Sequence, residues 1–135
     1  QGLLIARTHP DQIREKYGLK STPILWLTTI PGSDSIDPKS ISLLLHSAIE
    51  FLKKKNGSII LLDGLEYLGV YNRPEAILQF IYTLRDTTTL TGSKLIVAVD
   101  PEALGKCDLP RLERELEPIK LDISGVRRTT QSNTA

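Results

Sequence analysis

Four short apolar runs alternate with segments of helical pattern, and this alternation constrains the fold more than any other feature of the sequence. The runs span residues 3–6, 24–27, 59–62 and 95–99, and a weaker fifth candidate spans 119–123. Each of the four is continuous, which is typical of strands that are buried on both faces of a sheet. Strands that alternate with helices predict a parallel sheet with right-handed crossover connections.

Helix starts are indicated by candidate capping side chains that lie next to a proline. The fixed φ of proline suits the first helical turn, and a capping side chain satisfies a backbone amide there. This pattern recurs at residues 8–11, 37–38, 72–75 and 100–102. The helix expected over about 74–86 is apolar on nearly all sides, so we expect it to be deeply buried or to cover a partner.

The domain organisation follows from these elements. We predict a single three-layer α/β domain over residues 1–123, with a mostly parallel sheet of four to five strands and helices on both faces. The third and fourth runs are expected to be central. A RecA-like order would place the fourth run between the first and the third, whereas a flavodoxin-like order would place the first beside the third. Residues 124–135 are mostly small and polar, which predicts a flexible C-terminal tail or linker.

Composition excludes several classes of protein. The net charge is +1, from 17 basic and 16 acidic side chains, so we expect the domain as a whole neither to bind nucleic acid nor to be drawn to anionic lipid. The balance of charge does not argue against a small local patch. Cys107 is the only cysteine, so no internal disulfide can form, and a lone thiol suits a reducing cytoplasm. The apolar runs are too short for membrane insertion. The sequence opens at Gln1 inside an apolar run and contains no methionine, so we expect a fragment of a longer protein.

Candidate functional residues lie where the strands of such a sheet end. Ligands of doubly wound sheets bind beyond the carboxyl ends of the strands. A protein interface or a ligand crevice is therefore predicted there, and its candidate residues are Asp63, Glu66, Tyr67, Asn72 and Asp100.

Two catalytic or signalling chemistries that use an aspartate after a buried strand do not fit the sequence. In P-loop nucleotide hydrolases such an aspartate holds magnesium, but a glycine-rich loop must cradle the phosphates. Here residues 7–10 read Arg-Thr-His-Pro where that loop belongs. Response-regulator receivers need an acidic pair after the first strand and a lysine after the last, but Arg7 and Asp100 stand at those places. We therefore expect no enzymatic activity and no cofactor.

The acidic residues have two interpretations. Asp63 and Asp100 can cap the following helix or turn, as aspartate commonly does. Alternatively, Asp63, Glu66 and Asp100 could bind magnesium as a weak metal site if their strands are neighbours, because their oxygens suit that ion.

Asn72 and Tyr67 also have structural interpretations. Asn72 is predicted to cap the helix that starts at Pro74, with Glu75 completing a capping box. Tyr67 combines an apolar ring with a polar tip, which is typical of protein interfaces. It could equally plug the top of the core.

Three stretches together carry a resemblance to a known family. They are residues 26–38, residues 61–68 with the sequence Leu-Leu-Asp-Gly-Leu-Glu-Tyr-Leu, and residues 99–116. Together they resemble the archaeal family of domains of unknown function numbered 835, over about residues 2–117. The layout is also similar to a RecA/KaiC-like core without its phosphate loop. The resemblance implies an archaeal, cytoplasmic domain without assigned activity, which often stands at the cytoplasmic end of proteins with membrane segments or sensory modules.

The expected function is therefore a non-catalytic protein-interaction or scaffold module of a signalling or motility assembly. Its partner would be another protein or a second copy of itself, and its tether to the membrane would lie outside this fragment. The alternative is a degenerate nucleotide- or magnesium-sensing domain that uses the acidic strand ends. An unrecognised hydrolase is a third hypothesis, and the sequence supports it least.

Overall fold

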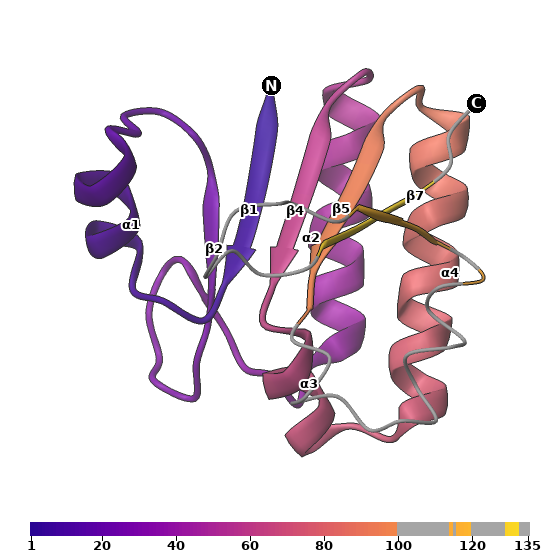
Figure 1. The fold of residues 1–135 in the computed structure, drawn as a ribbon. Coiled ribbons are helices and arrows are strands. Elements are labelled where there is room, and N and C mark those ends of the chain that lie inside the picture. The colour runs from indigo at the N-terminus through magenta and orange to yellow at the C-terminus, as the bar shows by residue number, and fades with distance from the viewer. Residues whose placement is uncertain (100–113, 115, 120–128, 133–135) are drawn as a thin grey trace.

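A computed structural model describes residues 1–99, 114, 116–119 and 129–132 (Figure 1). Along the chain, its elements are β1 (Gly2–Ala6), α1 (Pro10–Tyr17), β2 (Ile24–Leu27), β3 (Ser35–Ile36), α2 (Ile41–Lys54), β4 (Ile59–Asp63), α3 (Leu65–Tyr71), α4 (Pro74–Leu90), β5 (Lys94–Ala98), β6 (Leu116–Ile119) and β7 (Thr129–Ser132). None of the described helices combines the length and the apolar character that a membrane crossing demands.

The strands form one sheet in the order β3-β2-β1-β4-β5-β7-β6. The strands from β3 to β5 are parallel, whereas β7 runs antiparallel to both β5 and β6. The predicted, mostly parallel α/β sheet is confirmed, with β4 at its centre. The first apolar run lies beside the third, in register from Gly2↔Ile59 to Ala6↔Asp63. This is the flavodoxin-like alternative; the RecA-like order is wrong, because β5 lies outside β4 rather than between β1 and β4.

The C-terminal part of the sheet differs in detail from the expectation. The fifth candidate strand, 119–123, overlaps β6 only at Ile119, and residues 120–123 lie outside the described residues. Thr129–Ser132 form β7 within the segment for which the sequence predicts a flexible tail. Residues 124–128 and 133–135 lie outside the described residues, and the domain boundary at residue 123 stays a prediction.

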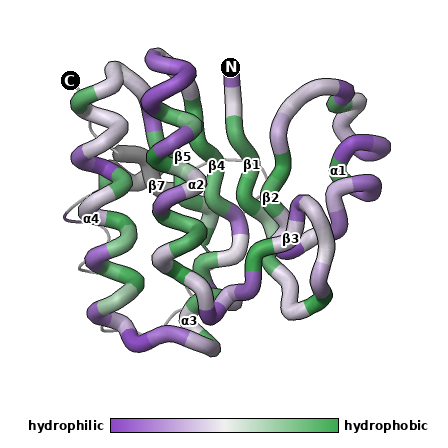
Figure 2. Tube along the Cα trace, turned by 180° about the vertical axis from the view of Figure 1, so that it is seen from behind, coloured by the Kyte–Doolittle hydropathy of each residue, from purple (hydrophilic) through white to green (hydrophobic). Residues whose placement is uncertain are grey.

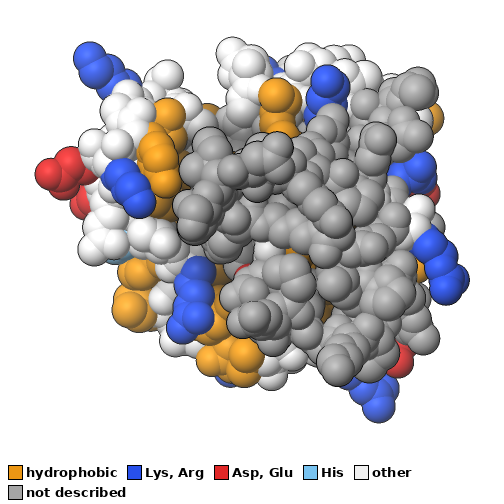
Figure 3. Space-filling model, viewed as in Figure 1, with side chains coloured by type: hydrophobic (Ala, Val, Ile, Leu, Met, Phe, Trp, Pro, Cys, Tyr) orange, Lys and Arg blue, Asp and Glu red, His pale blue; other side chains and the backbone are white. Residues whose placement is uncertain are grey.

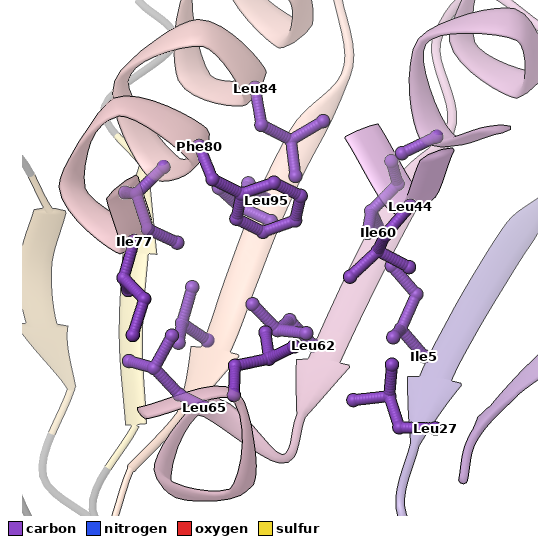
Figure 4. Close-up of a cluster of buried hydrophobic side chains, with 14 of the residues drawn as sticks. Ile5, Leu27, Leu44, Ile60, Leu62, Leu65, Ile77, Phe80, Leu84 and Leu95 are labelled. Carbon is purple, nitrogen blue, oxygen red and sulfur yellow. The ribbon is translucent and has the colours of Figure 1, made fainter. Parts of the chain in front are cut away.

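The main core lies between the sheet and the helix pair α2 and α4, which both lie on one face of it (Figures 1 and 2). Alternate residues of the central strands, such as Ile5, Leu62 and Leu95, point toward these helices and are fully buried. Figure 4 shows how they meet Leu44 of α2 and Phe80 of α4. Because side chains alternate along a strand, this face takes every second residue. Most apolar side chains of α4 are buried here, which agrees with the first of its two predicted roles, whereas Tyr82 is exposed.

The opposite face of the sheet carries less cover among the described elements. Helix α1 packs there against β1 and β2, where Ile13 meets Ala6 and Ile24 in a small second cluster. On the central strand β4, Ile59 is 43% exposed and Leu61 is 36% exposed. The prediction that every apolar run is buried on both faces is therefore wrong for β4; among the described helices, α1 covers β1 and β2 on this face instead.

At one predicted helix start an expected residue caps the helix, and at a second the helix begins later than predicted. At α1, the ring Nδ1 of His9 accepts a hydrogen bond of 3.0 Å from the Asp11 N–H, ahead of Pro10 in the first turn. At α2, the Asp37 carboxylate accepts the Lys39 N–H at 2.9 Å. The helix itself starts later, after Ser40, so Asp37 stabilises the turn that precedes α2. The predicted start at 100–102 lies outside the described residues.

Candidate functional site

The strand order reverses direction between β1 and β4. From β1 the chain passes through α1 to β2 on one side, and α2 later returns it to β4 on the other side. Sheets of this kind place their binding crevice at such a switch point, outside the carboxyl ends of the two strands. Arg7 follows β1 there, and Asp63 ends β4.

The two strand ends approach each other closely at Gly64. This residue has φ +143°, a conformation that only glycine adopts without strain. A Cβ atom at this position would lie 3.1 Å from Leu27 Cδ1 and 3.7 Å from the Arg7 backbone nitrogen. The backbone of the β4–α3 turn therefore packs directly on Arg7, the residue that follows β1. This contact leaves little space between the two strand ends at the switch point.

A row of cationic and aromatic side chains runs from this point along the carboxyl edge. The Arg7 guanidinium lies over the Tyr67 ring, 4.4 Å from its centroid. Tyr67 in turn meets Tyr71 edge to face, with centroids 5.4 Å apart. Lys39 Nζ lies 5.8 Å from the centroid of the Tyr71 ring. We call Arg7, Tyr67, Tyr71 and Lys39 the cation–aromatic row.

Local structure explains why these residues meet. Tyr67 and Tyr71 are four residues apart on α3, so they lie on the same face of the helix. The Trp26 Nε1–H donates a 2.9 Å hydrogen bond to the Arg7 carbonyl, which fixes the chain just after β1. Trp26 also contacts the His9 ring edge to face, at 4.7 Å between centroids. Arg7 thus contacts two aromatic pairs, with its guanidinium on Tyr67 of α3 and its carbonyl on Trp26, which meets His9 at the start of α1.

The four residues of the row differ in exposure to solvent. Tyr67 is half-buried and packs against the main core, while Arg7, Tyr71 and Lys39 are exposed. Desolvation raises the pKa of Tyr67 above its ordinary value, and a hydrogen bond with the Tyr71 side chain raises it further. The phenol is therefore neutral at neutral pH and can both donate and accept a hydrogen bond. Figure 3 shows Lys or Arg side chains beside hydrophobic ones at the lower left of the visible face.

The acidic candidates are only partly placed. Asp63 ends β4 and Glu66 lies in the first turn of α3, and both are half-buried. Asp100 lies outside the described residues. Within the described part of the chain, no three His, Cys, Asp or Glu side chains are grouped so that they could hold a metal ion. The weak metal site of Asp63, Glu66 and Asp100 therefore stays a prediction.

Asn72 has a different structural role from the predicted one. Its side-chain NH2 group donates to the Pro38 carbonyl at 2.8 Å and to the Leu68 carbonyl at 2.9 Å. Asn72 thus ends α3 and ties it to the turn before α2. Helix α4 begins after Arg73 without a side-chain cap. The predicted cap and capping box with Glu75 are wrong, because the Asn72 side chain donates its hydrogen bonds to the carbonyls of Pro38 and Leu68 instead.

Comparison with known proteins decides the family. A family model described as a protein of unknown function (DUF835) matches residues 1–116. The chain belongs to the DUF835 family. Among curated proteins, none matches this chain. The matched part of the DUF835 domain runs from β1 to the first residue of β6, so it contains the whole cation–aromatic row.

Three residues of the row are missing from the set that the sequence predicts. Tyr71 could have been found, because a second tyrosine four residues after Tyr67 must share its helix face. Arg7 directly follows the first apolar run, where this fold places its binding crevice. Lys39 carries no such signal, because only the tertiary fold brings the turn before α2 close to α3.

The corrected role of Asn72 is directly testable in the DUF835 domain. Asn72→Ala removes two hydrogen bonds to buried or half-buried carbonyls, and we expect it to lower the free energy of unfolding by about 1 to 2 kcal/mol. Glu75→Ala is the control and should change it by less than about 0.5 kcal/mol, since Glu75 is exposed and takes no part in a cap. Urea denaturation measures both. A cost for Glu75→Ala equal to that of Asn72→Ala would restore the capping box.

Proposed function

We propose that this DUF835 domain is a non-catalytic protein-interaction module, and that the cation–aromatic row is the centre of its binding surface. The observation that carries the proposal is the stack of the exposed Arg7 on the half-buried Tyr67, continued by the exposed Tyr71 and Lys39. The setting we propose is an archaeal cytoplasmic signalling or motility assembly. The tether to a membrane would belong to parts of the protein outside this fragment.

The chemistry of the row supports binding to a protein. Arginine and tyrosine, together with tryptophan, are enriched among the residues that contribute most to protein–protein binding, whereas most other contacts contribute little. A tyrosine ring supplies a large contact area with few rotatable bonds. Here the rings and the guanidinium already hold each other in place, so less side-chain entropy is lost when a partner binds. The row is thus ordered before binding.

The alternative, a nucleotide or magnesium sensor, has Asp63 and Glu66 in its favour. Both lie near the switch point, and Asp100 would have to join them. The close packing of Gly64 on the Arg7 backbone and the Arg7–Tyr67 stack occupy the place where a doubly wound sheet holds its ligand. This geometry supports the interaction module over the sensor.

A comparison of two tyrosines tests the proposal in the full-length protein. Tyr71 is 40% exposed within the row, and Tyr82 on α4 is 37% exposed outside it. Tyr71→Ser should release the tagged protein from its assembly in a native extract, seen as a shift to smaller size in sedimentation, and Arg7→Ser should act in the same way. Tyr82→Ser should leave the assembly intact. Tyr82→Ser should melt within about 2 °C of the wild type, because exposed substitutions have small effects. Tyr71→Ser also loses the edge-to-face contact with Tyr67, worth about 0.5 to 1.5 kcal/mol, so it should melt a few degrees lower and stay folded.

One sedimentation result would contradict the proposal. If Tyr71→Ser, Arg7→Ser and Tyr82→Ser all sediment like the wild type, the row is not the binding surface.

A thermal-shift screen with ATP, GTP, cyclic nucleotides and magnesium tests the alternative, a nucleotide or magnesium sensor. A ligand that binds the folded state raises its melting temperature by mass action. A shift that disappears in Asp63→Asn would favour the sensor.

A further inference from the structure

The edge from which the strands start carries a second surface, built on two turns that are hydrogen-bonded to each other. Between the α2–β4 turn and the α4–β5 turn, the Gly57 N–H donates to the Thr91 carbonyl at 3.0 Å. The Lys94 N–H donates to the Ser58 carbonyl at 2.9 Å, and the Ser58 N–H donates to Ser93 Oγ at 3.1 Å. The two turns therefore form one unit at the amino edge, at the top of Figure 1.

Lysines gather on this edge. They come from the end of α1, the turn after it, the end of α2 and the start of β5: Lys16, Lys20, Lys53, Lys54, Lys55 and Lys94. All six are exposed. In the part of the chain that the structure describes, none of their ammonium groups lies within 4.0 Å of a carboxylate. Residues 51–62 and 87–99, which contain the two turns, include no Asp or Glu.

Two large apolar side chains stand among these lysines. Leu90, the last residue of α4, is 86% exposed, and Tyr17, the last residue of α1, is 65% exposed. Lys16 Nζ lies 5.4 Å from the centroid of the Tyr17 ring. We call the six lysines together with Tyr17 and Leu90 the basic edge. Neighbouring strands are about 4.8 Å apart, so the starts of β2, β1, β4 and β5 span only about 15 Å.

Helix electrostatics explain part of this arrangement but not all of it. The negative end of a helix dipole favours the lysines in the last turns of α1 and α2. It does not account for Lys94, which starts a strand, or for Lys20, which lies in a turn. It also does not account for the exposure of Leu90, whose apolar side chain costs free energy in water.

We propose that the basic edge docks the domain on the surface of an anionic lipid bilayer. Lysines near such a surface are attracted by its negative potential, and tyrosine and leucine side chains partition into the headgroup region. A protein partner fits this edge less well, because lysine is depleted in protein interfaces while arginine and tyrosine are enriched. The docked domain would present its opposite, carboxyl edge, with the cation–aromatic row, away from the bilayer.

Vesicle flotation with the purified domain tests this docking. Wild type should bind vesicles that contain about one third phosphatidylglycerol in phosphatidylcholine, and it should not bind pure phosphatidylcholine. Binding should vanish at about 1 M salt, where the Debye length is about 3 Å. Lys54→Glu with Lys94→Glu should weaken the partition coefficient by at least about 25-fold, since each lysine contributes about a fivefold factor. Leu90→Ser should weaken it severalfold and leave its salt dependence unchanged.

A matched pair of single charge reversals, one on each edge, controls for net charge. Arg73→Glu lies at the carboxyl edge outside the cation–aromatic row, and it should keep most of the lipid binding. Lys94→Glu makes the same change in net charge at the amino edge, and it should weaken the partition coefficient at least about fivefold. Thermal melting of each variant shows that it is folded. Equal loss in these two variants, equal binding to neutral vesicles, or no binding by the wild type would overturn the proposal. Tighter binding to a short DNA duplex or an acidic peptide than to the vesicles would also overturn it. None of these results bears on the cation–aromatic row, so the two proposals fail independently.

Discussion

Gly64→Ala is expected to lower the free energy of unfolding by about 2 to 4 kcal/mol, because two penalties act together. The backbone at φ +143° is strained for any residue with a Cβ atom, and that atom would press on Leu27 Cδ1 at 3.1 Å. Leu27 is fully buried, so it has little room to move. Urea denaturation followed by circular dichroism measures the change.

Gly18→Ala is the matched control for this prediction. Gly18 also has a positive φ, of +67°, but a Cβ atom there would meet no atom within 4 Å. Its cost should be about 1 to 2 kcal/mol, the price of the left-handed conformation alone. Equal costs at Gly64 and Gly18 would mean that the β4–α3 turn does not pack on the end of β1 as described.

Leu62→Ala is expected to lower the free energy of unfolding by about 3 to 5 kcal/mol, which is typical of a large cavity in a well-packed core. Leu62 is fully buried between the sheet and the helix pair. Leu61→Ala is the control on the same strand, and it should cost less than about 1.5 kcal/mol, because Leu61 faces the other side and is 36% exposed. A one-residue shift of the strand would exchange the two values. Similar values would show that both faces of β4 are equally buried.

The sequence predicts the parallel strands well because their evidence is local. Four apolar runs and their helical spacers are sufficient to define β1, β2, β4 and β5, and all four form as predicted. Strand order is different, since an apolar run does not show which other run lies beside it. The choice between the RecA-like and flavodoxin-like orders therefore needed the structure.

Short strands and polar strands are also not predicted by a pattern of apolar runs. β3 consists of Ser35–Ile36 only, and β7 is the polar sequence Thr-Thr-Gln-Ser. Such strands are held by backbone hydrogen bonds to a neighbouring edge, which any side chain permits. The apolar period on which sequence analysis depends is missing from both.

The candidate site residues also differ in whether local sequence or the tertiary fold determines their contacts. Asp63, Glu66 and Tyr67 are placed at the carboxyl edge by the predicted strand end, and the structure puts them there. Asn72 lies there too, but its contacts with Pro38 and Leu68 depend on a segment distant in sequence and on the preceding helix. A capping motif in the sequence does not show whether the Asn72 side chain caps the next helix or makes these contacts instead.

Opposite edges of the sheet thus carry different chemistry. The carboxyl edge presents arginine and tyrosine in mutual contact, and the amino edge presents lysines with isolated apolar side chains. On the account proposed here, the first surface binds a protein and the second one rests on lipid. Docking through the amino edge would leave the proposed protein-binding side free.

Site-specific photocrosslinking tests the central claim most directly. A photoreactive phenylalanine analogue placed at Tyr71 of the full-length protein, inside cells, captures whatever protein contacts the cation–aromatic row. The same analogue at Tyr82 is the control, because the two side chains are about equally exposed. The account predicts a discrete crosslinked protein from position 71 that is missing from position 82 and is lost when Arg7→Ser is added. Crosslinks of equal yield from both positions, or none from position 71, would contradict it.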